Sequence, residues 1–315
     1  MGCHSSTSIL ILPTTHVNEN LDDGTEKKEK EHVHLMYCQL FRELLSKMNE
    51  TDRSNVISHC PDLYIDEENL AQSISNNEQL IDLMNYLRDK IADENPLVAL
   101  GRLMLEMGSY DRAEYFYLQT LPIEQDNWMR QAAILNNLGK ISHDQEKYDQ
   151  ALKYYESALE LQRKHISDDH PSLSTDYSNI GTVHQQQNRP ELALDYFQRA
   201  LKIQMHATTP DEELIALFHN NIGLIYNEQE KFSQGQIHHE KCLQMNEKLL
   251  PSTHPSLALS HHNLAISLVG LGRTSDAFDH IEKAIEITSQ SLPNNHPQRI
   301  AHQELLSTIR KRIQQ

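Results

Sequence analysis

The sequence predicts an all-α fold in which antiparallel helix pairs stack into a solenoid. The first observation is a phrase that returns every 42 residues, at Asn136–Gly139, Ser178–Gly181, Asn220–Gly223 and His262–Ala265. The second is that apolar residues within each copy lie three and four positions apart, the spacing of one helix face. The third is that small residues recur at two fixed places in each copy. A single pair cannot bury its apolar side alone, so neighbouring copies must stack.

The first complete copy shows how each unit is built. The small residues Gly139 and Ala151 are expected to let its two helices approach closely. The ring of Tyr155, or of Phe197 in the next copy, is expected to fill the gap to the following unit. The apolar positions of the two helices are Ile134, Leu138, Ile141, Tyr148, Leu152, Tyr155 and Leu159.

The composition changes along the chain and predicts four regions. The first is polar and lacks periodicity, so we expect it to be disordered. The second contains apolar stripes at Leu35–Met48 and Glu78–Ile91, which predict two short helices around a turn at Cys60. The last is a polar-faced helix that is expected to cap the open end of the stack. The predicted regions are 1–33 (disordered), 34–94 (short helices), 95–297 (about five tandem helix pairs) and 298–315 (capping helix).

The loops between copies carry His-Pro dipeptides, at His170-Pro171, His254-Pro255 and His296-Pro297. Proline suits the first position of a helix, where its missing N–H leaves no hydrogen bond unmade. Short polar side chains just before these dipeptides are the expected helix caps. These expected caps are Asp168, Asp169, Thr253, Asn294 and Asn295.

The order Leu-Gly, then Ala-x3-aromatic, resembles the tetratricopeptide repeat, or TPR. The wording "NNLG … YxxAxxYYxxAL … DHP" resembles the kinesin light chain type, from about residue 95 to the C-terminus. This resemblance implies a right-handed TPR superhelix whose concave groove binds peptide segments of other proteins. A kinesin light chain-like cargo adaptor is one alternative, although the long heptad-repeat segment that joins light chains to the motor is missing here.

A second resemblance concerns residues 36–64, whose wording is similar to the lead-in to an arginine ADP-ribosyltransferase domain. In some invertebrate proteins that domain accompanies such repeats. The arginine, serine and Glu-x-Glu elements of the enzyme core have no counterpart here, and Glu29-Lys30-Glu31 lies in a charged tail. This resemblance implies an enzyme-less relative of an ADP-ribosyltransferase–TPR protein.

One asparagine recurs just ahead of the small residue of each first helix, where the resemblance places the groove. An amide both donates and accepts hydrogen bonds, which suits a peptide backbone. The alternative is that these asparagines only bridge helices within the stack. The column is Asn137, Asn179, Asn221 and Asn263, and its expected neighbours in the groove are Lys140, His143, Thr182, Gln185, Leu224, Asn227 and Ile266.

The chain has 19 histidines, some of them adjacent in sequence. His219, His239 and His261 occupy places where the repeat pattern expects a packed residue, so we interpret them as core side chains rather than zinc ligands. No nucleophile elbow or phosphate-binding glycine loop is evident, because the glycines belong to helix packing. The sequence therefore predicts a protein without an enzyme activity, a cofactor or a metal.

The charge and cysteine content narrow the partners and the compartment. With 45 acidic and 28 basic residues the net charge is −17, which disfavours nucleic acid. The four cysteines form no CxxC or zinc spacing, which favours a reducing cytoplasmic environment. No run of about 18 apolar residues is present to span a membrane.

The N-terminal sequence Met1-Gly2-Cys3-His4-Ser5-Ser6 fits the pattern for N-myristoylation of Gly2, with Cys3 placed for a palmitoyl chain. Two acyl chains would attach the protein stably to a membrane surface, whereas one would not. A chance match in a disordered tail is the alternative. Taken together, the sequence predicts an adaptor or scaffold that binds a protein or peptide in a groove, with acylation as a route to peripheral membrane attachment.

Overall fold

The computed structural model describes residues 37–60, 63 and 95–314. The predicted helix Glu78–Ile91, the predicted tail 1–33 and the acylation residues Gly2 and Cys3 lie outside the described residues. Every regular element in the described part is helical, which confirms the all-α prediction.

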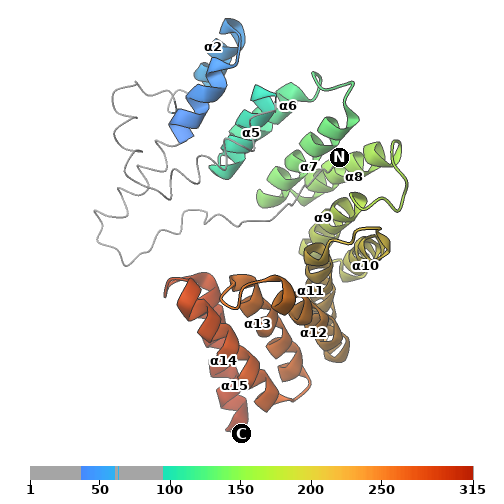
Figure 1. Cartoon of the computed structure of the whole chain (residues 1–315), viewed down its shortest axis with the longest axis vertical. Helices are drawn as coiled ribbons and strands as arrows, with labels where there is room; N and C mark the ends of the chain where they lie inside the picture. Colours follow the sequence, from blue (N-terminus) through green and yellow to red (C-terminus); the bar gives the residue numbers. More distant parts are fainter. Residues whose placement is uncertain (1–36, 61–62, 64–94, 315) are drawn as a thin grey trace, which may run out of the picture. The chain divides into compact units, whose positions relative to one another are not determined.

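The chain divides into two compact units, Met1–Ile123 and Glu124–Gln315. In the first unit, residues 37–46 form a helix, followed by α2 (Glu50–His59), α5 (Pro96–Glu106) and α6 (Tyr110–Thr120) (Figure 1). The pair α5 and α6 is the first helix pair of the region that begins at residue 95. It groups with the N-terminal residues rather than with the later pairs, whereas the predicted boundary at 95 separated them.

The N-terminal helices of the first unit pack onto its helix pair. Leu40, Phe41 and Leu44 are buried, and the His59 ring of α2 stacks on Tyr115 of α6, with centroids 4.1 Å apart. Helix α2 was not predicted, because Val56 is its only buried residue and no apolar stripe marks it. Its start is instead set by Asn49, whose side chain accepts a hydrogen bond from the Asp52 backbone N–H.

The second unit consists of four helix pairs and a final helix. Each pair makes its most extensive contacts between its own two helices, and the second helix of each pair then packs on the first helix of the next. These elements run from green to red in Figure 1. They are α7 (Trp128–Asp144), α8 (Tyr148–Arg163), α9 (Leu173–Gln186), α10 (Pro190–His206), α11 (Glu212–Glu228), α12 (Phe232–Leu249), α13 (Pro255–Gly270), α14 (Thr274–Ser291) and α15 (Pro297–Ile313).

The recurring glycine of each first helix lies against a ring of its own pair. A Cβ at Gly139 would lie 2.6 Å from the Tyr155 ring, and a Cβ at Gly181 would lie 3.0 Å from the Phe197 ring. The aromatic residues therefore pack on the glycine of their own pair, and both also belong to an apolar cluster that continues into the following pairs. Glycine is therefore needed at this place because a larger residue would collide with the aromatic ring between the two helices.

A left-handed residue joins the two helices of each pair. Glu146, Asn188 and Glu230 have φ between 56° and 59°, and Gly272 has φ 73°. The backbone N–H of the next residue reaches back over the helix end, as from Lys231 to the Tyr226 carbonyl (2.8 Å). This geometry satisfies carbonyls at the helix C-terminus and turns the chain sharply.

The second unit has one apolar cluster over α8–α11 and another over α12–α15. Phe197 and Phe218 are buried in the first cluster, and Leu268 and Ile281 in the second. Ile309 of α15 also belongs to the second cluster, so α15 covers the last pair as the predicted capping helix should. It begins at Pro297, one residue before the predicted start.

Two of the three His-Pro dipeptides start helices as predicted, with Pro255 and Pro297 at the first turn. The caps are the histidines themselves rather than the predicted Thr253 or Asn294 and Asn295. His254 Nδ1 accepts from the Ser256 N–H at 3.1 Å, and His296 Nδ1 accepts from the Gln298 N–H at 3.2 Å.

The loop at Pro171 departs from the prediction further, because α9 begins at Leu173 with Ser172 as its cap residue. Asp168, one of the expected caps, instead accepts a hydrogen bond from Arg163 Nε at 2.6 Å. Within the described residues, no helix combines the length and the apolar character that crossing a bilayer demands.

Candidate functional site

The first helices α7, α9, α11 and α13 are bonded to one another in series. Asn136 Nδ2 donates to Asp176 Oδ1 (2.6 Å) between α7 and α9, and Gln185 Nε2 donates to Glu228 Oε1 (2.6 Å) between α9 and α11. Ser267 Oγ donates to Asn227 Oδ1 (3.0 Å) between α13 and α11. Between these bonds, the first helices carry exposed or half-buried side chains at recurring places of the repeat. We name this set the first-helix face, and its members are Ala133, Asn137, Lys140, Thr175, Asn179, Thr182, Leu217, Asn221, Leu224, Leu259 and Ile266.

Three of the four predicted asparagines remain available on this face. Asn137, Asn179 and Asn221 are half-buried, and their side-chain amides have no hydrogen-bond partner among the described residues. Each amide therefore keeps its N–H donors and its carbonyl acceptor for a ligand or for water.

The fourth member, Asn263, differs from this expectation. Its side chain is 4% exposed, and its Nδ2 donates to Asn220 Oδ1 at 2.8 Å. Asn263 therefore bridges two helices within the stack, which is the alternative given for the asparagine column. Asn227 is a second correction, since its Oδ1 is tied to Ser267 and lies close to the backbone of Gly235.

The other predicted groove residues have varied surroundings. Lys140 is exposed on α7. His143 Nδ1 lies 3.2 Å from Asp144 Oδ1, and the Thr182 hydroxyl donates to the Ser178 carbonyl at 3.0 Å. The Gln185 amide is engaged with Glu228 across α9 and α11. Lys140 therefore remains the accessible cation of this set.

Sequence reasoning missed the polar column one residue earlier, which carries the contacts between successive first helices. Asn136 contacts Asp176, Asn220 contacts Asn263, and His262 Nδ1 lies 2.9 Å from His302 Nδ1. The signal was present as the first asparagine of the dipeptides Asn136-Asn137 and Asn220-Asn221. Only the structure shows which of the two asparagines faces the neighbouring helix.

Asp176 is the centre of the polar contacts among α7, α8 and α9. It is buried, and its two oxygens accept hydrogen bonds from Asn136 Nδ2 and Gln162 Nε2. Burial raises the pKa of this carboxyl to about 7, although the two hydrogen bonds act in the opposite direction. Through these two hydrogen bonds Asp176 links α9 to α7 and to α8.

The predicted packed histidines are confirmed as core side chains. His219, His239 and His261 are buried at the interface of their own helix pairs. His219 Nδ1 lies 2.9 Å from His238 Nδ1, and the same contact recurs one repeat later between His261 and His280 (2.9 Å). In each pair one ring nitrogen donates and the other accepts.

Burial is the first cause that lowers the pKa of these imidazoles, to about 4 for His219, His238 and His261. The charge of Lys241 acts in the same direction on His219 and His238. These side chains are therefore neutral at pH 7. Within the described residues, no three His, Cys, Asp or Glu side chains are grouped as a metal site would require.

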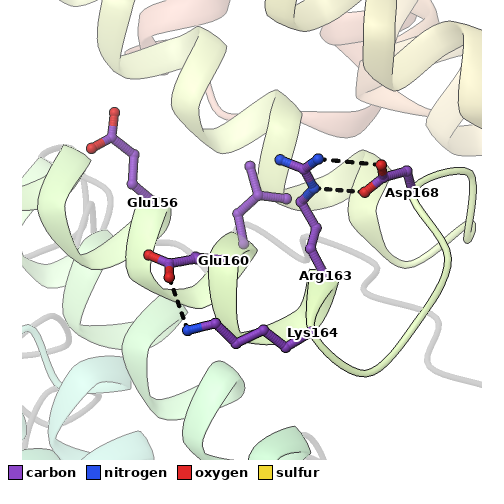
Figure 2. A pocket seen from close by; sticks show the side chains of 6 residues that line it. Glu156, Glu160, Arg163, Lys164 and Asp168 are labelled. Atoms are coloured by element: carbon purple, nitrogen blue, oxygen red, sulfur yellow. Dashed lines mark hydrogen bonds and ion pairs between the residues drawn. The ribbon is translucent and has the colours of Figure 1, made fainter.

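A shallow surface pocket lies along the second helix α8 and the loop after it (Figure 2). Two ion pairs lie along this pocket, between Glu160 and Lys164 Nζ (2.8 Å) and between Arg163 and Asp168. Glu156 and Leu159 complete the lining. The pocket is on a second helix and contains none of the predicted site residues.

A family model of the tetratricopeptide repeat matches residues 130–205 and 214–290. The crystal structure of BtubC (BKLC) from P. vanneervenii aligns with a TM-score of 0.57 at 19% identity, over 67% of this chain and 88% of that chain. The repeats of a putative kinesin light chain from Podosopora anserina align with a TM-score of 0.50 at 20% identity, over 57% and 85%. At these identities the likeness concerns the fold.

Among curated proteins, the human Cell division cycle protein 16 homolog is 31% identical over 113 residues, 33% of this chain. The match spans 17% of the human protein. The resemblance of residues 36–64 to an ADP-ribosyltransferase lead-in stays a prediction. The matched segments 130–205 and 214–290 are tetratricopeptide repeats, and the chain has the fold of a TPR solenoid that is similar to kinesin light chain-like repeats.

Proposed function

We propose that this protein is a non-catalytic adaptor that holds a peptide segment of another protein against its first-helix face. The observation that carries the proposal is the row of Asn137, Asn179 and Asn221. These amides are half-buried on successive first helices and unpaired within the described residues. TPR repeats as a fold support the proposal, since stacked helix pairs leave a long face free for a partner.

The chemistry of the amide suits a peptide main chain. One asparagine can donate to a peptide carbonyl and accept from a peptide N–H at the same time. A partly buried position makes each such bond stronger than it would be in open water. Asparagine is also less favourable than alanine inside a helix, by roughly 0.7 kcal/mol. Helix stability therefore does not explain why it recurs on three successive first helices.

The test begins with a random peptide display library selected on the full-length protein. An enriched peptide is then synthesised with a fluorescent label, and its affinity is measured by anisotropy. We expect the double variant Asn179→Ala with Asn221→Ala to weaken binding by roughly tenfold or more, since each lost hydrogen bond contributes about 1 kcal/mol.

The matched control is Asn294→Ala, which removes an exposed asparagine from the loop before α15. It should leave the affinity unchanged. If the double variant also binds with unchanged affinity, or if no peptide is enriched, the asparagines do not hold a ligand and the proposal fails.

A further inference from the structure

The first-helix face changes chemistry halfway along the stack. At one position of the repeat, the residues are Ala133, Thr175, Leu217 and Leu259 in chain order. At the position one turn beyond the asparagines, they are Lys140, Thr182, Leu224 and Ile266. The first two repeats thus present methyl, hydroxyl and ammonium groups, whereas the last two present large aliphatic side chains.

These four aliphatic side chains belong to two first helices, α11 and α13, that are bonded to each other. Leu217 and Leu224 are seven residues apart on α11, and Leu259 and Ile266 are seven apart on α13, so each pair shares one side of its helix. The bonds from Asn263 to Asn220 (2.8 Å) and from Ser267 to Asn227 (3.0 Å) hold the two helices together at the same levels. We name Leu217, Leu224, Leu259 and Ile266 the aliphatic patch.

The stacking of the repeats does not require this patch. Leu217 is 38% exposed and Leu259 is 37% exposed, while Leu224 and Ile266 are half-buried. The apolar cluster of the last repeats is formed by other residues of α13, such as Leu257, Leu264 and Leu268. A group of exposed aliphatic side chains on a chain of this polarity indicates a contact surface.

The two helices of the patch carry acidic but no basic side chains, and Arg312 of α15 reaches the Val269 carbonyl at the C-terminal end of α13. Neither α11 nor α13 contains a lysine or arginine. Glu212 and Glu213 are exposed in the first turn of α11, and Glu228 is exposed in its last turn. The whole chain carries a net charge of −17. An approaching segment with positive charges would be attracted to this end of the stack, and an acidic one would be repelled.

We propose that the aliphatic patch receives a peptide segment with at least two large apolar side chains flanked by lysine or arginine. The inference rests on the proposed peptide-binding function, and it specifies the partner and the end of the stack that selects it. Asn221 lies between Leu217 and Leu224 on α11, so it is placed to bond the main chain of a peptide whose side chains reach the aliphatic patch.

The same display selection tests this partner class. We expect enriched peptides to combine two or more Leu, Ile, Met or Phe residues with Lys or Arg. The double variant Leu217→Ser with Leu259→Ser should weaken binding of such a peptide by roughly a hundredfold, since each partly buried leucine contributes about tenfold. In a separate measurement, raising the salt concentration from about 0.05 M to about 0.3 M should weaken binding of this peptide by the wild type, because salt screens the attraction between opposite charges.

The control variant is Leu192→Ser with Ile237→Ser, which removes two exposed aliphatic residues (46% and 51%) from the second helices α10 and α12. It should bind like the wild type. Thermal unfolding of all the proteins checks that the substitutions leave the fold intact.

Three outcomes would overturn the inference. Enrichment of acidic or purely polar peptides contradicts the charge and the apolar anchor. Unchanged affinity in the Leu217→Ser with Leu259→Ser variant, while the asparagine variant binds weakly, removes the aliphatic patch and leaves the proposed function standing. A concentration-dependent dimer in sedimentation that the leucine variant abolishes would assign the patch to a second copy of the chain.

Discussion

The asparagines that share one place in the repeat differ in their surroundings. Asn179 is half-buried without a side-chain partner, whereas Asn263 is buried and bonded to Asn220. The difference arises because the neighbouring first helix of Asn263 offers a carbonyl oxygen at hydrogen-bonding distance. The same residue type therefore has two roles, which sequence position alone does not separate.

This contrast predicts opposite effects of alanine on stability. Asn179→Ala should raise the free energy of unfolding by roughly 0.5 kcal/mol, because alanine is the better helix former and no bond is lost. Asn263→Ala should lower it by about 1–2 kcal/mol, because it removes a buried amide and leaves the half-buried Asn220 carbonyl without its donor. Urea unfolding of the two variants measures both, and equal effects would contradict the assignment.

The left-handed turn residues allow a second prediction. Glu230 has φ 57°, a region that suits glycine, and Gly272 occupies the equivalent place one repeat later. Glu230→Gly should therefore raise the free energy of unfolding by about 0.5–1 kcal/mol. Glu247→Gly, at an exposed position inside α12, is the matched control and should lower it by about 1 kcal/mol. Chemical denaturation compares the two, and a loss of stability in Glu230→Gly would count against the strained turn.

At the scale of helix pairs, the histidines replace larger rings at one interface. In the second pair, Tyr177 of α9 faces Tyr196 of α10, with ring centroids 6.1 Å apart. In the third pair, His219 of α11 faces His238 of α12, with ring centroids 5.0 Å apart. Two neutral imidazoles form a hydrogen bond here, whereas two protonated rings beside Lys241 would repel each other.

This arrangement predicts a pH dependence of stability. The pKa values of His219 and His238 are lowered to about 4 in the folded chain, below the ordinary value of 6.5. The unfolded state therefore binds more protons between pH 6.5 and 4, so the stability that the pair contributes is present above pH 6.5 and is lost as the pH falls towards 4. The unfolding temperature should decrease over this window.

The variant His238→Gln keeps a hydrogen-bonding group but removes one titrating ring, so its unfolding temperature should decrease less between pH 6.5 and 4. His206→Gln, at an exposed position at the end of α10, is the control and should behave like the wild type. A pH profile of His238→Gln that coincides with the wild-type profile would show that this pair does not govern acid stability.

At the scale of the whole molecule, each repeat of the second unit contacts mainly its neighbours. In such a stack, stability is the sum of local terms, and damage at one end should stay local. The final helix α15 closes the second apolar cluster through Ile309, and Arg312 Nη1 donates to the Val269 carbonyl at 3.3 Å.

Ile309→Ala should therefore loosen the C-terminal end. We expect a loss of about 2–4 kcal/mol for the buried side chain, seen as faster amide exchange in α13–α15. Exchange in α7–α10 should remain as in the wild type. Uniform acceleration over the whole second unit would instead indicate one cooperative block.

The N-terminal pattern leads to a prediction about membrane attachment. If Gly2 is myristoylated, Gly2→Ala should abolish incorporation of labelled myristate and reduce the fraction of protein in the membrane pellet of expressing cells. Cys3→Ser should reduce the membrane fraction while keeping the myristate label, because a single chain anchors only marginally. Equal partition of all three proteins would remove the lipidation hypothesis.

Much of the fold could be predicted because the repeat period is written directly in the sequence. Helix α2 could not, since its capping residue and single buried Val56 leave no apolar stripe. In the candidate site, the asparagine column was predicted, but the exclusion of Asn263 and Asn227 was not. Their burial depends on how one first helix sits against the next.

The sequence by itself determined the helix pairs, their 42-residue spacing and the recurring small residues of the first helices. These features follow from periodicity and residue size, which are local properties of the chain. Only the tertiary structure decided which asparagine amides have no hydrogen-bond partner among the described residues and which form hydrogen bonds between helices. It also bonded α11, which carries Leu217, to α13, which carries Leu259, although the two residues are 42 apart in the sequence. A hydrogen-bond partner or a neighbouring side chain from another repeat exists only after the helices have packed.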